Sequence, residues 1–322
     1  MGADRPDDAE MPPDEHPDRP PHRNENGSRP AASGGGEAET RSREECYVDL
    51  CILAAREESV AARQASAEEQ AAAEKWDEQK GESHRMWGEY QRKWPPADRP
   101  PIDRSKDPPG SWRSDGNKFL DRADNCQVDA ACDRVGALER DKISPAMRAV
   151  ESQDPDRHLI GFDRRLKDRD RIKEKVCDKI EEFGFSPEKA VSSVSDTIRY
   201  TFEYREGRYT QGVWADIGHL KDQGFEFDKL KNYWSDGQYR GINSQWIHPD
   251  TGQRFEVQFH TRISFEAKQL THKAYERIRT GQADEFEKLV LKAFQQKVSA
   301  EIPVPPGAAD IPDYPERGAD AR

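Results

Sequence analysis

The sequence predicts an α+β domain in which a mixed β-sheet is flanked by helices, and two patterns carry that prediction. Apolar and polar residues alternate over residues 253–260, where Phe255, Val257 and Phe259 fall on one side. This two-residue period is typical of a β-strand. Helical and strand patterns also follow one another in the order α-α-β-α-β-β-β-α-α, which favours a mixed sheet covered by helices.

Composition divides the chain into a folded part and polar extensions. Only 33% of the 322 residues are apolar and 35% are charged, which is too polar for one compact core throughout. We therefore expect a disordered, acidic, Pro- and Gly-rich tail over 1–44, a helical extension over 45–95, a linker over 96–116, the main domain over 117–300, and a C-terminal tail over 301–322.

The net charge of −12 is unevenly placed. Lys and Arg slightly outnumber Asp and Glu over residues 157–280, so the excess acid lies outside that segment. This favours a small anionic ligand over a long nucleic acid held by a broad basic surface. No apolar run approaches the roughly 20 residues of a membrane helix, and the first residues, MGADRPDDAE, do not resemble a Sec signal peptide. We expect a cytoplasmic protein with no membrane partner, and export by another route stays open.

The expected helices begin with the extension, where Met86, Trp87, Tyr90 and Trp94 recur at helical spacing. A helical hairpin, a partner-binding helix and a helix docked on the main domain all fit this pattern. The five cysteines have irregular spacing that matches neither a zinc site nor a disulfide framework. Free thiols are expected, with a bridge between Cys126 and Cys132 open in an oxidising setting.

A helix predicted over 162–183 carries a basic stripe. Its cations follow one another at intervals of four residues, which costs about 0.2–0.5 kcal/mol per like-charged pair. Bound phosphates would turn that repulsion into attraction, although an ordinary solvated helix face has the same pattern. The stripe consists of Lys167, Arg171, Lys175 and Lys179.

Further along, strands are predicted over 197–204 and 225–232 with a helix over 209–222 between them. Turn residues at 249–252 predict a hairpin of strands 242–248 and 253–260. A helix then begins at the cap candidate Ser264, carries His272 and Tyr275, and ends near Gly281. A last amphipathic helix follows near residues 286–298.

Two carboxylates are associated with predicted core strands, one at the entrance of a strand and one within a strand. Asp196 precedes the strand at 197–204, and Glu256 lies midway along 253–260 on its polar face. Carboxylates beside a polycationic helix suit a Mg²⁺-dependent phosphoryl-transfer site, where one of them also accepts a proton from an attacking hydroxyl. The alternation over residues 253–260 does not by itself indicate a site, because a solvated strand face would show the same pattern.

Five segments in order resemble the synthetase domain of RelA/SpoT-type alarmone synthetases: RRLKDRDRIKEK, SDTIRYTF, GQYRGIN, FEVQFHT and EAKQLTHKAY. The resemblance covers residues 157–280. It implies a nucleotidyltransferase-like fold and a Mg²⁺-dependent transfer of the β,γ-pyrophosphoryl group of ATP to the 3′-hydroxyl of a purine nucleotide, GDP or GTP, with release of AMP.

By position, the resemblance implies that Asp196 and Glu256 are the catalytic pair and bind Mg²⁺. Tyr239 resembles the tyrosine that stacks on the acceptor base. Arg165 resembles the arginine that stacks on adenine, and the ATP-binding set would be Arg165, Lys167, Arg171, Lys175 and Arg199. The remaining acceptor-binding residues would be Asn243, Gln258, His260, Lys229, Lys231 and Arg240.

The chain departs from the family pattern mainly on the acceptor side. Asn243 replaces a His, and His260 replaces an Arg. Ser235 stands where a basic residue is usual, which leaves Lys229, Lys231 and Arg240 as substitutes for it. Nearer the ATP site, Arg171 replaces a Ser, and the spacing from Asp196 to Arg199 is two residues shorter than usual.

No His-Asp dipeptide of a metal phosphohydrolase is present, so the resemblance implies a synthesis-only relative. Some small relatives are toxins that use adenine nucleotides or the 3′ end of tRNA as acceptors. Residues 1–112 would then bind an antitoxin or immunity partner. A third hypothesis is a catalytically inactive nucleotide-binding module. The sequence does not indicate the oligomeric state.

Overall fold

The computed structural model describes residues 43–95 and 102–314, with side chains described from residue 66 onward in the first range. The chain forms two compact units, Met1–Ala55 and Arg56–Arg322. The tail expected over 1–44 lies almost wholly outside the described residues, as do 315–322 of the expected C-terminal tail.

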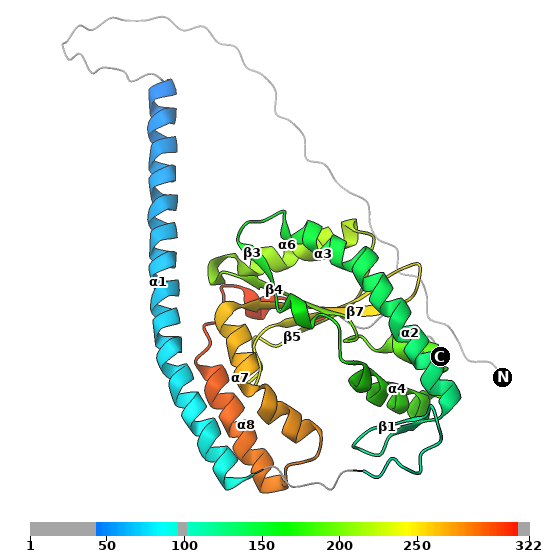
Figure 1. Cartoon of the computed structure of the whole chain (residues 1–322). Coiled ribbons are helices and arrows are strands. Elements are labelled where there is room, and N and C mark those ends of the chain that lie inside the picture. The colour runs from blue at the N-terminus through cyan, green and yellow to red at the C-terminus, as the bar shows by residue number, and fades with distance from the viewer. Residues whose placement is uncertain (1–42, 96–101, 315–322) are drawn as a thin grey trace, which may run out of the picture. The chain divides into compact units, whose positions relative to one another are not determined.

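A five-stranded sheet organises the second unit (Figure 1). β4 and β7 run parallel at its centre, while the other neighbours are antiparallel. The mixed α+β architecture expected from the sequence is thereby confirmed. In sheet order the strands are β3 (Arg157–Ile160), β4 (Arg199–Tyr204), β7 (Arg254–Thr261), β6 (Ile242–Ile247) and β5 (Glu226–Asn232).

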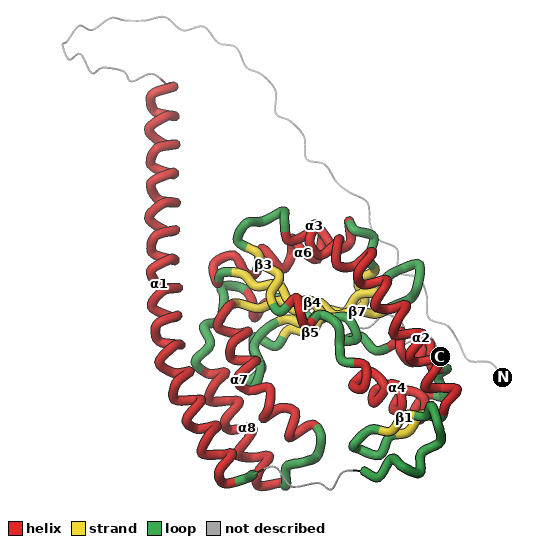
Figure 2. The backbone as a smooth tube through the Cα atoms, in the orientation of Figure 1, coloured by secondary structure: helices red, strands yellow, loops and turns green. Residues whose placement is uncertain are grey.

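Helices cover both faces of this sheet (Figure 2). α3 and α6 lie on one side, and α4, α7 and α8 lie on the other. A π-helical turn at Glu139–Ile143 separates α2 from α3, and a small sheet of β1 (Trp112–Arg113) and β2 (Phe119–Leu120) precedes them. The bounds are α2 (Arg122–Leu138), α3 (Ser144–Glu151), α4 (Arg169–Phe183), α5 (Pro187–Ser193), α6 (Tyr209–Asp222), α7 (Arg262–Arg279) and α8 (Glu285–Ala300).

Strand β7 is buried on both of its faces. Phe255, Val257 and Phe259 enter the apolar core, as the alternation predicts. The opposite face is not a solvated surface, because Glu256 is only 7% exposed and its polar neighbours are buried too. Buried polar side chains need hydrogen-bond partners, so we expect the side chains on this face to bond to other residues of the protein or to a ligand.

The start of α4 differs from the prediction. The expected helix over 162–183 is broken into a 3₁₀ turn at Phe162–Arg164 and α4 from Arg169. The carboxylate of Asp168 caps α4 by accepting the backbone N–H groups of Asp170 and Arg171, and a cap of this kind fixes the first turn of a helix. Lys167 therefore precedes the helix, and its backbone N–H donates to the Thr197 carbonyl at 2.9 Å.

Helix α7 begins earlier than predicted. Thr261, not Ser264, is the N-cap, and the two side chains form a capping box in which each hydroxyl accepts the other residue's backbone N–H. The predicted end near Gly281 is close to the observed last residue, Arg279.

The extension forms one continuous 51-residue helix, α1 (Arg43–Lys93), so the hairpin alternative is wrong. Its described aromatic residues dock on α7 and α8. Trp76 is 1% exposed and its indole N–H donates to Glu266 at 3.0 Å, while the Tyr90 hydroxyl donates to Glu287. The helical spacing of the aromatic residues thus reflects burial against the main domain.

The chain beyond α8 also packs on the domain where the sequence suggested a tail. Ile302, Ala308 and Ile311 are buried, and Tyr314 pairs with Leu230 of β5. Cys126, Cys132 and Cys177 are free thiols. Among the described helices, none combines the length and apolar character needed to cross a membrane.

Candidate functional site

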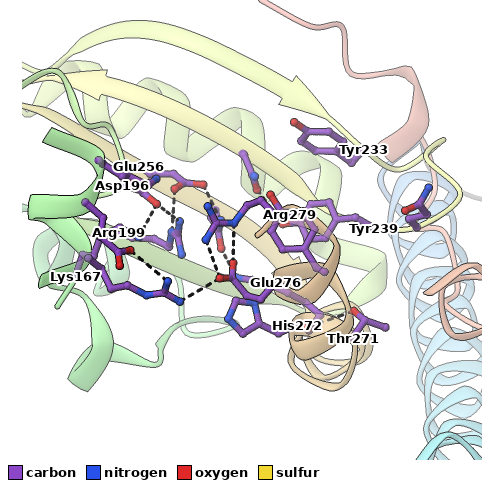
Figure 3. A pocket seen from close by; sticks show the side chains of 18 of the residues that line it. Lys167, Asp196, Arg199, Tyr233, Tyr239, Glu256, Thr271, His272, Glu276 and Arg279 are labelled. Atoms are coloured by element: carbon purple, nitrogen blue, oxygen red, sulfur yellow. Dashed lines mark hydrogen bonds and ion pairs between the residues drawn. The ribbon is translucent and has the colours of Figure 1, made fainter. Parts of the chain in front are cut away.

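A cavity of about 510 Å³ opens between the sheet and helices α4, α7 and α8 (Figure 3). It gathers most of the residues singled out from the sequence, from both the ATP and the acceptor sets. The predicted residues that line it are Lys167, Arg171, Lys175, Asp196, Arg199, Tyr239, Asn243, Glu256 and Gln258.

Asp196 lies three residues before β4 and is surrounded by cations. Its carboxylate is 2.8 Å from the Lys167 ammonium, 2.7 Å from that of Lys175, and 3.0 Å from the Arg199 guanidinium. Burial by itself would raise the pKa of Asp196, but Lys167 and Lys175 outweigh it and lower the pKa to about 2. The group is a carboxylate throughout the physiological range.

Glu256 is brought beside Asp196 by the parallel pairing of β4 with β7. Arg199 stands opposite Glu256 in the register, and its Nε donates to Glu256 Oε2 at 2.8 Å while its Nη2 contacts Asp196. One guanidinium therefore spans both carboxylates (Figure 3). The short spacing from Asp196 to Arg199 still places Arg199 inside the site.

Lys268, on α7, was not singled out from the sequence. Its ammonium donates to Gln258 Oε1, and Gln258 Nε2 donates to Glu256 Oε1 at 2.6 Å. Burial lowers the pKa of Lys268 to about 8, with repulsion from Arg199 adding to it and Glu256 opposing it. Its helical spacing, four residues before His272 and seven before Tyr275, was the signal that could have found it.

Tyr239 is held at the other side of the cavity by a buried hydrogen-bonded network. Its hydroxyl donates to Asn243 Oδ1 at 2.8 Å and lies 2.9 Å from His260 Nε2. Its ring meets that of Tyr233 edge-on, with centroids 5.2 Å apart. His260 is fully buried behind Tyr239 and does not line the cavity. Burial, assisted by Lys268, moves the pKa of His260 well below its usual value, so the imidazole is neutral.

The outer cations of the cavity are paired across two helices. Arg171 of α4 contacts Glu276 of α7 at 3.1 Å, and Arg279 contacts the same carboxylate at 2.8 Å. Glu276 thus links α4 to α7 at the cavity (Figure 3). An incoming phosphate would compete with Glu276 for these two guanidinium groups.

Several predicted residues lie elsewhere. Arg165 is paired with Glu139 at 2.6 Å and rests over the Phe162 ring, 4.3 Å from its centroid. Lys231 is in the edge strand β5 and contacts Asp313 at 2.6 Å. The residues outside the cavity lining are Arg165, His260, Lys229, Lys231 and Arg240.

The carboxylate oxygens at this site fit Mg²⁺ that is also bound by a nucleotide. Asp196 and Glu256 supply hard carboxylate oxygens and are already spanned by one cationic group, Arg199. No cluster of three or more His, Cys, Asp or Glu side chains suited to a metal occurs in the part of the chain that the structure describes. Mg²⁺ commonly takes one or two carboxylates and completes its coordination with phosphates and water, which matches a pair rather than a cage.

Comparison with known proteins gives matches among solved structures only. No protein-family model and no curated protein matches the chain. The structure is similar to small alarmone synthetase 1 from Bacillus subtilis, with 13% identity, a TM-score of 0.36, and coverage of 53% of this chain and 88% of that one.

Two further structures show likeness of the same order. One is a GTP pyrophosphokinase family protein from Streptococcus pneumoniae, with 15% identity, a TM-score of 0.36, and coverage of 56% and 92%. The other is smu.1046c from Streptococcus mutans UA159, with 16% identity, a TM-score of 0.35, and coverage of 51% and 86%. Identities and TM-scores this low do not allow an activity to be inferred from these proteins. Any inference about activity must therefore rest on the residues that line the cavity.

Proposed function

We propose that the protein is an ATP-dependent 3′-pyrophosphotransferase that acts on a purine nucleotide, GDP or GTP, and yields a 3′-pyrophosphorylated nucleotide and AMP. The observation that carries the proposal is the Arg199-bridged pair of Asp196 and Glu256, which lies in one cavity with Lys167, Lys175 and Tyr239. The order of the five motifs supports the same reaction.

In this reaction the 3′-oxygen of the acceptor attacks the β-phosphorus of ATP. The bond from that phosphorus to the oxygen shared with the α-phosphate breaks, and AMP leaves with that oxygen. Glu256 accepts the proton of the 3′-hydroxyl, because its carboxylate oxygens retain lone pairs beyond those engaged by Arg199 and Gln258.

Other side chains of the cavity bind the phosphates of the substrates and position the acceptor base. Lys167 and Lys175 hold the phosphates that pass between the two substrates, while Tyr239 offers its ring to the acceptor base. Asp196 and Glu256 would hold Mg²⁺, which, when bound, neutralises charge on the phosphates. Asp196 also holds the two lysines close together through its ion pairs with both.

The test is incubation of the purified protein with Mg²⁺, ATP and, in turn, GDP, GTP, ADP and deacylated tRNA. Release of AMP coupled to one acceptor, followed by anion-exchange chromatography, would establish the reaction and name the acceptor. The adenine-nucleotide and tRNA alternatives are decided by the same panel. Absence of ATP consumption with every acceptor would contradict the proposal.

Glu256→Gln separates an enzyme from an inactive nucleotide-binding module. The variant keeps a side chain of the same shape but cannot accept the proton, so we expect turnover to fall by about 10²–10⁴-fold with nucleotide affinity largely kept. Glu226→Gln, at an exposed position of β5, is the matched control and should retain full turnover. Unchanged turnover in Glu256→Gln would remove Glu256 as the base.

A further inference from the structure

Lys268 of α7 is a cation of the cavity wall whose partner is an amide and not a carboxylate. Its ammonium donates to Oε1 of Gln258 and lies 5.3 Å from the centroid of the Phe265 ring. It forms no ion pair with an Asp or Glu among the residues whose side chains the structure describes. Taking an ammonium partly out of water without a counter-ion costs free energy, which points to a role beyond stability.

Gln258 stands between Lys268 and Glu256 and can bridge them in only one orientation. Gln258 and Glu256 lie two residues apart on one face of β7, and both are buried. An ammonium offers only N–H donors, and a carboxylate offers only acceptor oxygens. The amide oxygen must therefore face Lys268 and the amide nitrogen must face Glu256. This is the arrangement observed, with Gln258 Nε2 at 2.6 Å from Glu256 Oε1.

Each carboxylate oxygen of Glu256 is thereby held by one fixed donor. Gln258 Nε2 bonds to Oε1, and Arg199 Nε bonds to Oε2 at 2.8 Å. A general base has to lie within hydrogen-bond reach of the proton that it takes, and a displacement of about 1 Å can cost roughly 100-fold in rate. Without Lys268 the Gln258 amide would be free to turn its oxygen toward Glu256, where two acceptors would face each other.

We propose that Lys268 is a positioning residue that acts through Gln258. It fixes the direction of the Gln258 amide and so holds the carboxylate of Glu256 in the orientation that accepts the proton of the 3′-hydroxyl. This inference rests on the proposed function. Because Lys268 acts on the base and not on the nucleotides, its loss should slow the chemical step and leave nucleotide binding largely unchanged.

The first test is steady-state kinetics of Lys268→Met with ATP and GDP. Met keeps the length and the apolar stem of Lys but donates no hydrogen bond, so we expect kcat to fall by about 10- to 100-fold while the KM for both nucleotides changes little. Lys273→Met, at an exposed position of the same helix, is the matched control and should keep the wild-type kcat. An unchanged kcat in Lys268→Met, or a loss confined to KM, would overturn the proposal.

Lys268→Arg tests whether a cationic donor restores the effect. It keeps the charge and the N–H groups, so it should retain more of the wild-type kcat than Lys268→Met does. An equal loss in both variants would count against the role. This variant also keeps the proposal open to disproof should Lys268→Met not fold, because Lys268→Arg with the kinetics of the Lys273→Met control is then the expected result and a large fall in its kcat contradicts it.

A double-mutant cycle tests whether Lys268 acts through Gln258. Gln258→Met by itself removes the donor to Glu256 Oε1, so adding Lys268→Met to it should lower kcat little further. A double variant whose loss equals the product of the two single losses would overturn the proposal, since Lys268 would then act by another route.

If the wild-type protein consumes no acceptor, the proposed function fails, and a measurement without turnover decides whether Lys268 holds the amide. NMR would follow the exchange of the Gln258 side-chain N–H protons with solvent, with their signal assigned by its loss in Gln258→Met. We expect exchange to be slow in the wild type and in Lys273→Met, and at least about 10-fold faster in Lys268→Met. Equal exchange rates in the wild type and in Lys268→Met would overturn the inference.

Discussion

At the scale of single residues, the cavity holds like charges close together at a cost to stability. Lys167, Lys175 and Arg199 converge on Asp196, and burial lowers the pKa of Lys167 even with Asp196 opposing the effect. A nucleotide's phosphates would bring additional negative charge to these cations. We therefore expect bound nucleotide to stabilise the fold by an amount that grows with its concentration relative to its dissociation constant.

Lys268 gives a prediction for the pH dependence of stability. The pKa of Lys268 is about 8 in the folded chain, whereas its ordinary value is 10.5. At a pH between these two pKa values, the unfolded chain therefore binds more protons than the folded chain. The free energy of unfolding should therefore rise with pH in this window, by about 3 kcal/mol from this one group. In Lys268→Met that rise should disappear. Urea unfolding at several pH values from 7.5 upward would measure it.

Lys273→Met is the matched control for this prediction. Lys273 is exposed on the same helix, so its removal should leave the pH dependence as in the wild type. A Lys268→Met protein whose stability still rises with pH as steeply as that of the wild type would show that Lys268 is not the group responsible.

At the scale of elements, α1 is part of the folded domain through its second half. Trp76 and Tyr90 reach carboxylates of α7 and α8, and the rings of Trp87 and Phe294 lie 5.6 Å apart. Both α7 and α8 line the cavity. The docking of α1 therefore supports both helices at the cavity.

We predict that Trp76→Ala destabilises the protein by about 3–5 kcal/mol, because it leaves a large cavity and removes the donor to Glu266. Glu78→Ala, at an exposed position of the same helix, should change stability by less than about 0.5 kcal/mol. Chemical denaturation of both variants would measure the difference. Equal effects would mean that α1 does not pack as described.

At the scale of the whole molecule, the two compact units predict different outcomes for two truncations. Removal of residues 1–55 takes away only the first unit, so the thermal midpoint and turnover should stay as in the full chain. Removal of residues 1–112 also deletes Trp76 and Tyr90, which are buried in the domain, and should lower the midpoint markedly. Thermal unfolding and the AMP-release assay would compare them.

Loss of stability on removing 1–55, or none on removing 1–112, would contradict this division. The comparison also bears on the hypothesis of an antitoxin or immunity partner bound through 1–112. A partner that needs only residues 1–55 can be tested without disturbing the domain, whereas loss of binding in the longer truncation would not distinguish a missing surface from an unfolded one.

The sequence by itself determined the features that depend on local periodicity and on the order of motifs. The alternation around Phe255 and Phe259 predicted a core strand. Asp196 was placed just before one predicted strand and Glu256 within another, and these two strands prove to be neighbours. Side-chain alternation and helical spacing are properties of consecutive residues, so they can be detected without knowing how distant segments pack.

Only the tertiary structure decided what fills the space between those elements. Parallel pairing of β4 with β7 joins Arg199 to Glu256, which are 57 residues apart in sequence. Packing of α7 brings Lys268 to the same cavity, and pairing with Glu139 turns Arg165 away from it. These contacts depend on strand register and on the choice among competing ion-pair partners, and both are settled by packing between distant segments.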